Sequence, residues 1–456
     1  MPENTHGQKH DPYVLSELTI KEPPTTFGGR FKYLGPGLVL SASIVGSGEL
    51  IATTTLGARA GFVTLWVILV SCIIKVALQL EFGKHVIDSG ESTFASFNLL
   101  PGPRLGRANW SIWTWLVIMI LKFIQVGGIV GGVALTLNIA FPNVGVSVWA
   151  WLVALSVALL VFQGYYHSIE KIALVMMALF TLLTLTCVVF VQFTEYAFTW
   201  ANLAEGLTFN LPRAAVGVAI AAFGITGVGG DEIMCYNYWC IEKGYAAYTG
   251  PKKDSPDWTA RAKGWIKVMY MDAFLSMVIY TVATAAFYLL GAAVLHGRGE
   301  IPKGFQMVEI LSRMYTESLG GWAKGVFLVG AFVVLYSTLF AGLAAWTRLF
   351  SDCFGQIGLL NFYDQKLRAR AIAILAFVIP TGWTLFFLFM KAPVFMVLLG
   401  GIGTSLMLLI VIFAAINFRY VRLDASLKPG KFYDLWLWLS IVVIAFVGVY
   451  GIVKLF

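Results

Sequence analysis

Two clusters in the sequence combine glycines with acidic residues inside long apolar stretches. Residues 43–49 read Ser-Ile-Val-Gly-Ser-Gly-Glu, and residues 224–232 read Gly-Ile-Thr-Gly-Val-Gly-Gly-Asp-Glu. Each glycine favours unwinding of a helix by about 1 kcal/mol relative to alanine. A helix that is broken inside hydrocarbon leaves backbone amides and carbonyls without partners, so the break must line a polar cavity or hold a ligand. The two clusters therefore predict a binding site between two broken helices.

A simpler interpretation gives each cluster a structural role only. Glycines permit close packing of helices in membranes, and the acidic residues would then sit at the membrane interface. That interpretation suits a single cluster. Two clusters in corresponding positions, each with an acid, favour the site.

The stretches that carry these clusters are apolar enough to cross a membrane. The chain has 456 residues, of which 59% are hydrophobic and 12% are charged, and its mean hydropathy is +0.79. An ordinary soluble protein is about 25% charged, so that class is excluded. Because a transmembrane helix needs about 20 apolar residues, we expect an all-α polytopic membrane protein with eleven transmembrane helices, at 34–57, 62–82, 110–141, 148–166, 170–193, 214–240, 266–295, 322–350, 371–390, 392–417 and 433–455.

The two clusters lie five segments apart, in the first and the sixth. This is the spacing expected when two five-helix repeats enter the membrane from opposite sides and share a site between two discontinuous helices. The expected organisation is therefore an N-terminal tail (1–33), a first repeat (34–193), a second repeat (214–417) and an additional C-terminal helix (433–456).

Most of the 32 Lys and Arg residues fall in alternate connections. The side that holds the N-terminal tail also receives the connections at 84–107, 243–267, 364–370 and 419–431. Since cytoplasmic loops retain positive charge, we expect a plasma-membrane protein with its N-terminus in the cytoplasm and its C-terminus outside. This distribution also explains the net charge of +8 and removes nucleic acid as an expected partner.

Several short motifs occur in a characteristic order along the chain. Gly35-Pro36-Gly37 opens the first segment, Gly61-Phe62 through Leu65-Trp66 opens the second, and Gly132 through Asn138 ends the third. In this order they resemble the Nramp family of divalent-metal transporters, and more closely its branch of Nramp-related magnesium transporters. The resemblance implies a LeuT-like fold of two inverted five-helix repeats, with discontinuous helices 1 and 6 and one further helix at the carboxyl end.

The chain departs from the Nramp pattern at both clusters. The family's Asp-Pro-Gly-Asn motif falls on residues 46–49, and its Ala-x-x-Met-Pro-His motif falls on residues 226–231. The metal-binding aspartate of the family is thus Gly46 here, its asparagine is Glu49, and its methionine is Gly229. The resemblance implies a metal site with Glu49 as the main anion, built from Glu49, Gly46, Ser47, Thr226, Gly227, Gly229 and Asp231.

These departures predict a wider pocket with harder ligands. Loss of the thioether leaves oxygen donors, which suit magnesium better than later transition metals. Magnesium gives up water reluctantly and commonly binds through one or two carboxylates while it keeps several waters. We therefore expect partly hydrated Mg²⁺ as the preferred substrate, with Mn²⁺ also accepted. Because adjacent residues point about 100° apart on a helix, Asp231 and Glu232 are not expected to face the ion together, and Glu232 is assigned to the positive start of its own half-helix.

Nramp transporters that couple to protons keep acidic residues along the third helix, and those positions are Val126 and Ile129 here. We therefore expect alternating access without proton coupling. Lys75 and Lys122 lie deep in the second and third segments. They could be fixed countercharges that replace a proton path, or they could pair with buried acids or carbonyls. For Lys75 the structural role, pairing with buried acids or carbonyls, is favoured. For Lys122 both roles remain open.

Three other functions are alternatives. A proton-coupled Mn²⁺ or Fe²⁺ transporter of the same family would need the missing Met, Asp and His. An organic-solute symporter of LeuT-like fold would bind a carboxylate, which Glu49 disfavours. A membrane-embedded enzyme would use Glu49 and Asp231 as an acid/base pair, but nothing resembles a nucleophile or a cofactor site. We expect a transporter, not an enzyme, without a cofactor and acting as a monomer, with divalent cations and the lipid bilayer as its partners.

Overall fold

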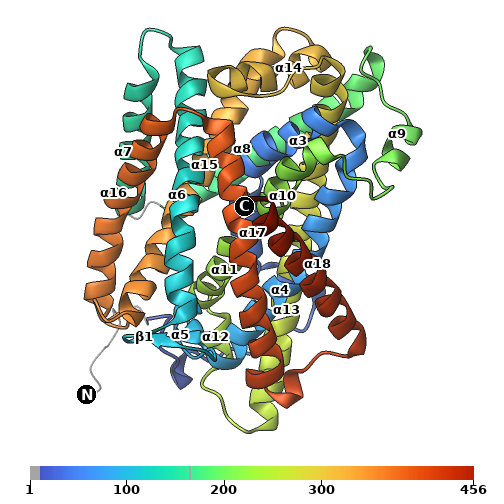
Figure 1. The fold of residues 1–456 in the computed structure, drawn as a ribbon. Coiled ribbons are helices and arrows are strands. Elements are labelled where there is room, and N and C mark those ends of the chain that lie inside the picture. The colour runs from blue at the N-terminus through green and yellow to red at the C-terminus, as the bar shows by residue number, and fades with distance from the viewer. Residues whose placement is uncertain (1–10, 164–165, 456) are drawn as a thin grey trace.

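The computed structural model, which describes residues 11–163 and 166–455, is a bundle of helices that run between two ends (Figure 1). One end carries α14 (Met307–Leu319), and the opposite end carries α5 (Thr93–Phe97) and α12 (Tyr245–Thr249). Residues 1–10 of the predicted tail, residues 164–165 at the end of the segment predicted at 148–166, and residue 456 lie outside the described residues. Among the described residues, the one sheet is a hairpin of β1 (Arg104–Leu105) and β2 (Ala108–Asn109).

Helices occupy every predicted membrane segment in the described part of the chain. They are α2 (Pro36–Ile44), η2 (Gly48–Thr53) and α3 (Thr54–Ala60) in the first segment, then α4 (Leu65–Ser89), α6 (Trp110–Ala140), α7 (Val146–Phe162), α8 (Tyr166–Phe190), α10 (Val216–Ile225) with α11 (Gly230–Lys243), α13 (Pro256–Leu290), α15 (Ala323–Gln356), α16 (Gln365–Met390), α17 (Pro393–Asn417) and α18 (Lys431–Leu455). Shorter helices and turns join them: η1 (Glu17–Thr19), α1 (Phe27–Phe31), η3 (Gly61–Thr64), η4 (Val191–Phe193), α9 (Trp200–Glu205), η5 (Arg213–Ala215), η6 (Gly291–Leu295), η7 (Gly304–Gln306), η8 (Phe418–Arg422) and η9 (Ala425–Leu427).

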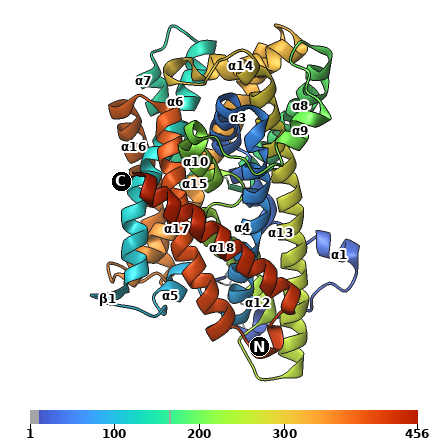
Figure 2. The same ribbon diagram turned by 45° about the vertical axis from the view of Figure 1, so that its right-hand side comes forward.

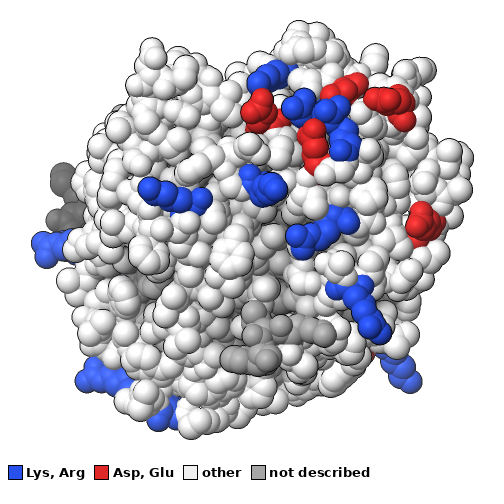
Figure 3. Space-filling model, turned by 45° about the horizontal axis from the view of Figure 1, so that its top comes forward, with Lys and Arg blue, Asp and Glu red and all other residues white. Residues whose placement is uncertain are grey.

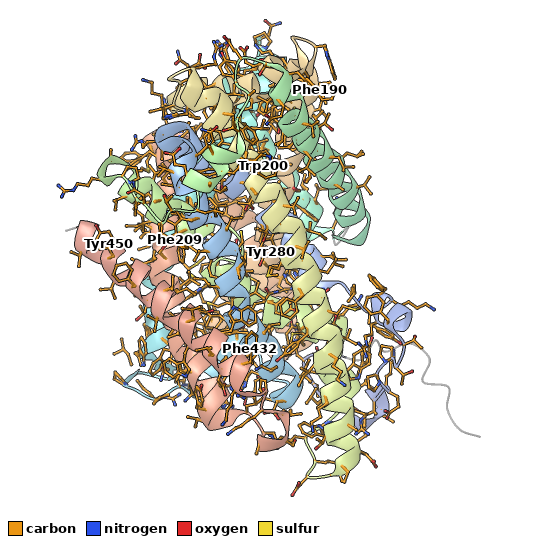
Figure 4. All side chains as sticks on the ribbon, turned by 90° about the vertical axis from the view of Figure 1, so that its right-hand side faces the viewer. Phe190, Trp200, Phe209, Tyr280, Phe432 and Tyr450 are labelled. Atoms are coloured by element: carbon orange, nitrogen blue, oxygen red, sulfur yellow. The ribbon has the colours of Figure 1, made fainter. Side chains whose placement is uncertain are left out.

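Length and apolar composition identify eight of the described helical stretches as candidate membrane spans, and two further apolar helices are shorter. The protein is therefore a helical polytopic membrane protein, whereas the number eleven and the division into two repeats stay predictions. The C-terminal helix α18 lies obliquely across the outside of α17 and α4 (Figure 2). Tyr280 on α13 points toward α4 (Figure 4), where its hydroxyl donates to the Cys72 carbonyl at 3.3 Å.

The connections expected on the N-terminal side lie at one end of the bundle. Lys252 pairs with Asp88 at 2.7 Å and with Asp424 at 3.4 Å, which joins three of these connections. Arg368 pairs with Asp11 at 2.9 Å and so ties the N-terminal tail to a fourth. The shared side that the charge pattern predicted is therefore confirmed. Its assignment to the cytoplasm stays a prediction.

The opposite face, at the α14 end, gathers acidic and basic side chains over one area, and separate basic side chains are scattered over the rest of it (Figure 3). Arg298 pairs with Glu300 and Glu317, and Arg313 also pairs with Glu300. Since these charges neutralise one another, they do not form a single-sign surface at this end.

The first helix is interrupted where its glycine–acid cluster predicted a break. The backbone leaves α2 after Ile44 and resumes in η2, a turn of π-helix, at Gly48. Asp272 on α13 caps the other end of α2 by accepting bonds from the backbone amides of Gly35 and Gly37. A carboxylate favours the positive start of a helix, so α2 is held to α13 at its first turn.

The second break separates α10 from α11 at residues 226–229. Gly227 has φ +65°, a conformation that other residues rarely adopt. The Lys75 ammonium on α4 donates to the carbonyls of Phe223 at 2.7 Å, Gly224 at 3.2 Å and Thr226 at 2.5 Å. Three carbonyls at the C-terminal end of α10, where the break begins, thus accept from the same ammonium group. The structural role expected for Lys75, pairing with carbonyls, is confirmed.

Replacing Lys75 with methionine should destabilise the fold. The substitution keeps the apolar stem but leaves the end of α10 without its shared donor, and buried polar groups without partners cost about 1–3 kcal/mol each. We expect Lys75→Met to lower the midpoint of thermal unfolding in detergent, whereas Lys267→Met, at an exposed position of α13, should leave it unchanged. Equal midpoints for Lys75→Met and the wild type would contradict this role.

Candidate functional site

A cavity of about 50 Å³ lies beside the two helix breaks, enclosed by α2, α6, α11 and α15. That volume has room for only a few water molecules. Its polar lining comes from Ser43, Ser47, Lys122, Gln125, Asp231, Glu232 and Thr338. Aliphatic and aromatic side chains form most of the remaining wall, and the Cys235 thiol is its one sulfur-bearing side chain among the described residues. The cavity is thus a small, largely apolar compartment inside the bundle, and its polar groups are mostly oxygen donors.

Two carboxylates open α11 and face this cavity. Asp231 and Glu232 follow Gly230, the first residue of the helix, and both line the cavity. The expectation that only one of them faces the site is therefore wrong. A Cβ placed on Gly229 would lie 2.2 Å from a carboxylate oxygen of Glu232, so the missing side chain is what lets Glu232 fold back over the helix start. The start of a helix favours both charges.

Lys122 brings a positive charge to the same cavity. Its ammonium lies 3.0 Å from Oδ1 of Asp231, and it donates to Gln125 Oε1 at 2.7 Å and to Thr404 Oγ1 at 2.8 Å. Lys122 is 2% exposed and Asp231 is 5% exposed, so the pair is shielded from water. The interpretation of Lys122 as the partner of a buried acid is thus the one that the structure shows.

Glu49, the expected main anion, lies behind the cavity rather than in its lining. It is fully buried on η2, where Oε2 accepts from the Gly46 amide at 3.2 Å and Oε1 accepts from Thr284 at 3.1 Å. These bonds join the first break to α13. Glu49 and Asp231 therefore have separate partners, which gives no support to an acid/base pair.

The two glycines that replace family ligands do not leave open space. A Cβ on Gly46 would lie 1.9 Å from Thr338 Oγ1, and the space beside Gly229 holds the Glu232 carboxylate. In this conformation a hydroxyl from α15 and a carboxylate from α11 occupy the space beside these glycines, and the wider pocket stays a prediction. Both groups present oxygen, as expected for harder ligands.

The other expected ligands divide between the cavity and the break behind it. Ser47 and Asp231 line the cavity. The Thr226 carbonyl accepts from Lys75 and from the Ser71 hydroxyl at 3.0 Å, and Gly227 packs against Cys72 on α4. Sequence reasoning missed Gln125, whose spacing of three residues from Lys122 places it on the same helix face. It also missed Ser43, although this residue opens the first glycine–acid cluster, and Thr338, for which no sequence signal was apparent.

The described residues contain no group of three or more His, Cys, Asp and Glu side chains that could hold a metal ion. A cation in the cavity would meet two carboxylates together with hydroxyl and amide oxygens. Water would fill the coordination positions that these donors leave open, an arrangement that magnesium accepts readily.

Comparisons with known proteins identify relatives of this chain. The model of the Natural resistance-associated macrophage protein-like (Nramp) family matches residues 37–454. The divalent metal cation transporter MntH of Mesorhizobium japonicum is 22% identical over 381 residues, which cover 81% of this chain and 77% of that protein. MntH 1 of Pseudomonas aeruginosa is 23% identical over 365 residues, which cover 77% and 76%. An uncharacterized protein of Pasteurella multocida is 23% identical over 347 residues, which cover 74% and 73%.

Solved structures share the fold. A crystal structure of the Eremococcus coleocola manganese transporter has a TM-score of 0.67 at 15% identity, over 96% of this chain and 90% of that chain. Mhp1, a nucleobase-cation-symport-1 family transporter, has a TM-score of 0.58 at 14% identity, over 95% and 92%. The predicted fold class is thereby confirmed as a polytopic helical protein with LeuT-like neighbours. Because the family match extends over most of the chain, the protein belongs to the Nramp family, whose members are transporters and not enzymes.

Proposed function

We propose that this protein carries divalent metal cations across the plasma membrane, and that the ion binds in the cavity beside Asp231 and Glu232. The observation that carries the proposal is this pair of carboxylates at the start of α11, in a small cavity between two broken helices. Charged side chains are rarely placed so deep in a membrane protein without a functional reason. The names of the MntH relatives, which are divalent metal cation transporters, point to the same substrate class.

Partly hydrated Mg²⁺ is the substrate that best fits the donor set. Carboxylate, hydroxyl and amide oxygens are hard ligands, and no thioether lines the cavity among the described residues. Two carboxylates leave several positions for water, which Mg²⁺ retains. Mn²⁺ is an accepted second ion, since it also binds oxygen donors and since a fold relative is a manganese transporter. Cys235 is the side chain through which softer ions would gain affinity.

Transport proceeds by alternating access without proton coupling. Val126 and Ile129 line the cavity from α6, and neither can exchange a proton. Two positive charges moving inward gain about 4.6 kcal/mol per 100 mV of inside-negative potential, so uptake needs no coupled proton. The N-terminus is cytoplasmic in this proposal, which places the basic connections on the retained side.

An organic-solute symporter of the same fold is a weaker candidate. A cavity of about 50 Å³ holds a few waters and not an organic molecule. Two carboxylates against one lysine would also repel the carboxylate of an amino acid.

One prediction of the proposed function concerns which acid binds the ion. Purified protein in liposomes should take up Mg²⁺ and Mn²⁺, followed with a magnesium dye and a manganese-quenched dye, and Asp231→Asn should reduce both rates at least about tenfold because a divalent ion loses a desolvated charge partner. Glu49→Gln should reduce the uptake rates less, since Glu49 accepts hydrogen bonds from the Gly46 amide and from Thr284. Asp424→Asn, which alters an acid in a distant connection, is the matched control. Full uptake by a correctly assembled Asp231→Asn protein would show that the ion binds elsewhere.

Another prediction of the proposed function concerns protons. Mg²⁺ uptake driven by an inside-negative potential should produce no acidification that an internal pH dye can detect. A pH gradient imposed at clamped voltage should not drive accumulation. Magnesium-dependent acidification that disappears in Asp231→Asn would instead support the proton-coupled manganese or iron transporter.

A further inference from the structure

Lys122 carries an organised shell of oxygens that resembles a cation site. Its ammonium has three oxygen atoms within 3.0 Å: a carboxylate oxygen of Asp231, the amide oxygen of Gln125 and the hydroxyl oxygen of Thr404. These groups come from α11, α6 and α17. Carboxylate, amide and hydroxyl oxygens are also the donors that hard metal ions use. The Lys122 ammonium therefore occupies a set of oxygen donors of the kind that could also bind a metal ion.

We propose that Lys122 is a tethered cation that occupies this oxygen site in the empty transporter and is displaced from Asp231 by the incoming divalent ion. This inference rests on the proposed function. Lys122, Gln125 and Asp231 all line the cavity, so an ion that enters the cavity meets the same carboxylate that holds the lysine. Metal ion and ammonium then compete for Asp231.

Competition with Lys122 for Asp231 favours ions of higher charge. Coulomb attraction scales with the product of the charges, so a divalent ion is drawn to Asp231 about twice as strongly as the ammonium at the same distance. A monovalent ion has no such advantage over the ammonium. Lys122 thus discriminates against sodium and potassium, the common cations on either side of a plasma membrane.

The same lysine keeps the divalent ion exchangeable. Two carboxylates and one ammonium give the cavity a formal charge of −1, which becomes +1 when a divalent ion enters. Without Lys122 the ion would sit in a neutral complex, with nothing to repel it. Repulsion between the displaced ammonium and the bound ion therefore favours release.

Displacement does not strip Lys122 of all its partners. Gln125 and Thr404 still accept from the ammonium after Asp231 turns to the metal ion. Gln125 is held in place by close packing on α17, since a Cβ on Gly400 would lie 2.1 Å from the Gln125 Cβ. Displacement therefore breaks one ion pair but does not leave a buried charge without partners.

The test measures Mn²⁺ binding to the full-length protein in detergent, from the electron paramagnetic resonance signal of free Mn²⁺, in choline buffer and in sodium buffer. Lys122→Gln should bind Mn²⁺ on the order of tenfold more tightly in choline, because no ion pair has to be broken. Sodium should weaken Mn²⁺ binding to Lys122→Gln but not to the wild type. Liposomes with Lys122→Gln should take up Mn²⁺ more slowly in spite of the higher affinity.

Lys84→Gln is the matched control, because Lys84 is an equally buried lysine on α4 that pairs with Glu81 and does not line the cavity. It should show wild-type affinity and no sensitivity to sodium. Thr404→Val serves if Lys122→Gln does not fold. It removes one acceptor that holds the displaced ammonium without changing the charge, so it should weaken Mn²⁺ binding because displacement from Asp231 then costs more.

Unchanged or weaker Mn²⁺ binding by folded Lys122→Gln, without new competition by sodium, would overturn the tethered cation. If Lys122→Gln is not obtained, unchanged or tighter Mn²⁺ binding by Thr404→Val would overturn it. Failure of the proposed function has a different signature: the wild type would take up neither ion, or Asp231→Asn would bind Mn²⁺ as the wild type does.

Discussion

A helix that is broken inside an apolar bundle must find partners for the backbone groups that the break exposes, and the architecture around the cavity follows from that constraint. Lys75 and the Ser71 hydroxyl supply donors to the open end of α10. At the first break, the Glu49 carboxylate accepts from the Gly46 amide and from Thr284 on α13. Because Lys75 and Ser71 lie on α4 and Thr284 lies on α13, the two broken helices are held by the two helices that pack against them. The position of the cavity is thus set by backbone chemistry before any ligand enters it.

The two deep lysines meet this constraint in different ways. Lys75 neutralises no acid in the cavity and serves carbonyl dipoles. Lys122 faces Asp231 and so balances part of the charge that the start of α11 concentrates in a small volume. A positive charge on carbonyls stabilises one conformation, whereas a positive charge on an exchangeable carboxylate can take part in a binding equilibrium. Two residues of the same type and similar depth therefore have unlike consequences.

Local patterns in the sequence predicted the main features of the fold. Apolar runs located the helices, and glycines beside Glu49 and Asp231 located both breaks. The pattern of basic residues predicted which connections share a side, and the ion pairs of Lys252 confirm it. Details of the site were predicted less well, because they depend on contacts between distant segments. Thr338 fills the space beside Gly46 from 292 residues along the chain, and no local pattern reports such a contact.

The positions of the acids also bear on how firmly an ion can be held. Glu49 is engaged by the Gly46 amide and by Thr284, so the negative charge in the cavity itself comes from Asp231 and Glu232. At the start of α11 these carboxylates interact with the positive end of the helix as well as with Lys122. Both interactions reduce the net attraction that they offer to an ion. A site of this kind favours an ion that keeps much of its water and exchanges readily over one that must be stripped and tightly enclosed.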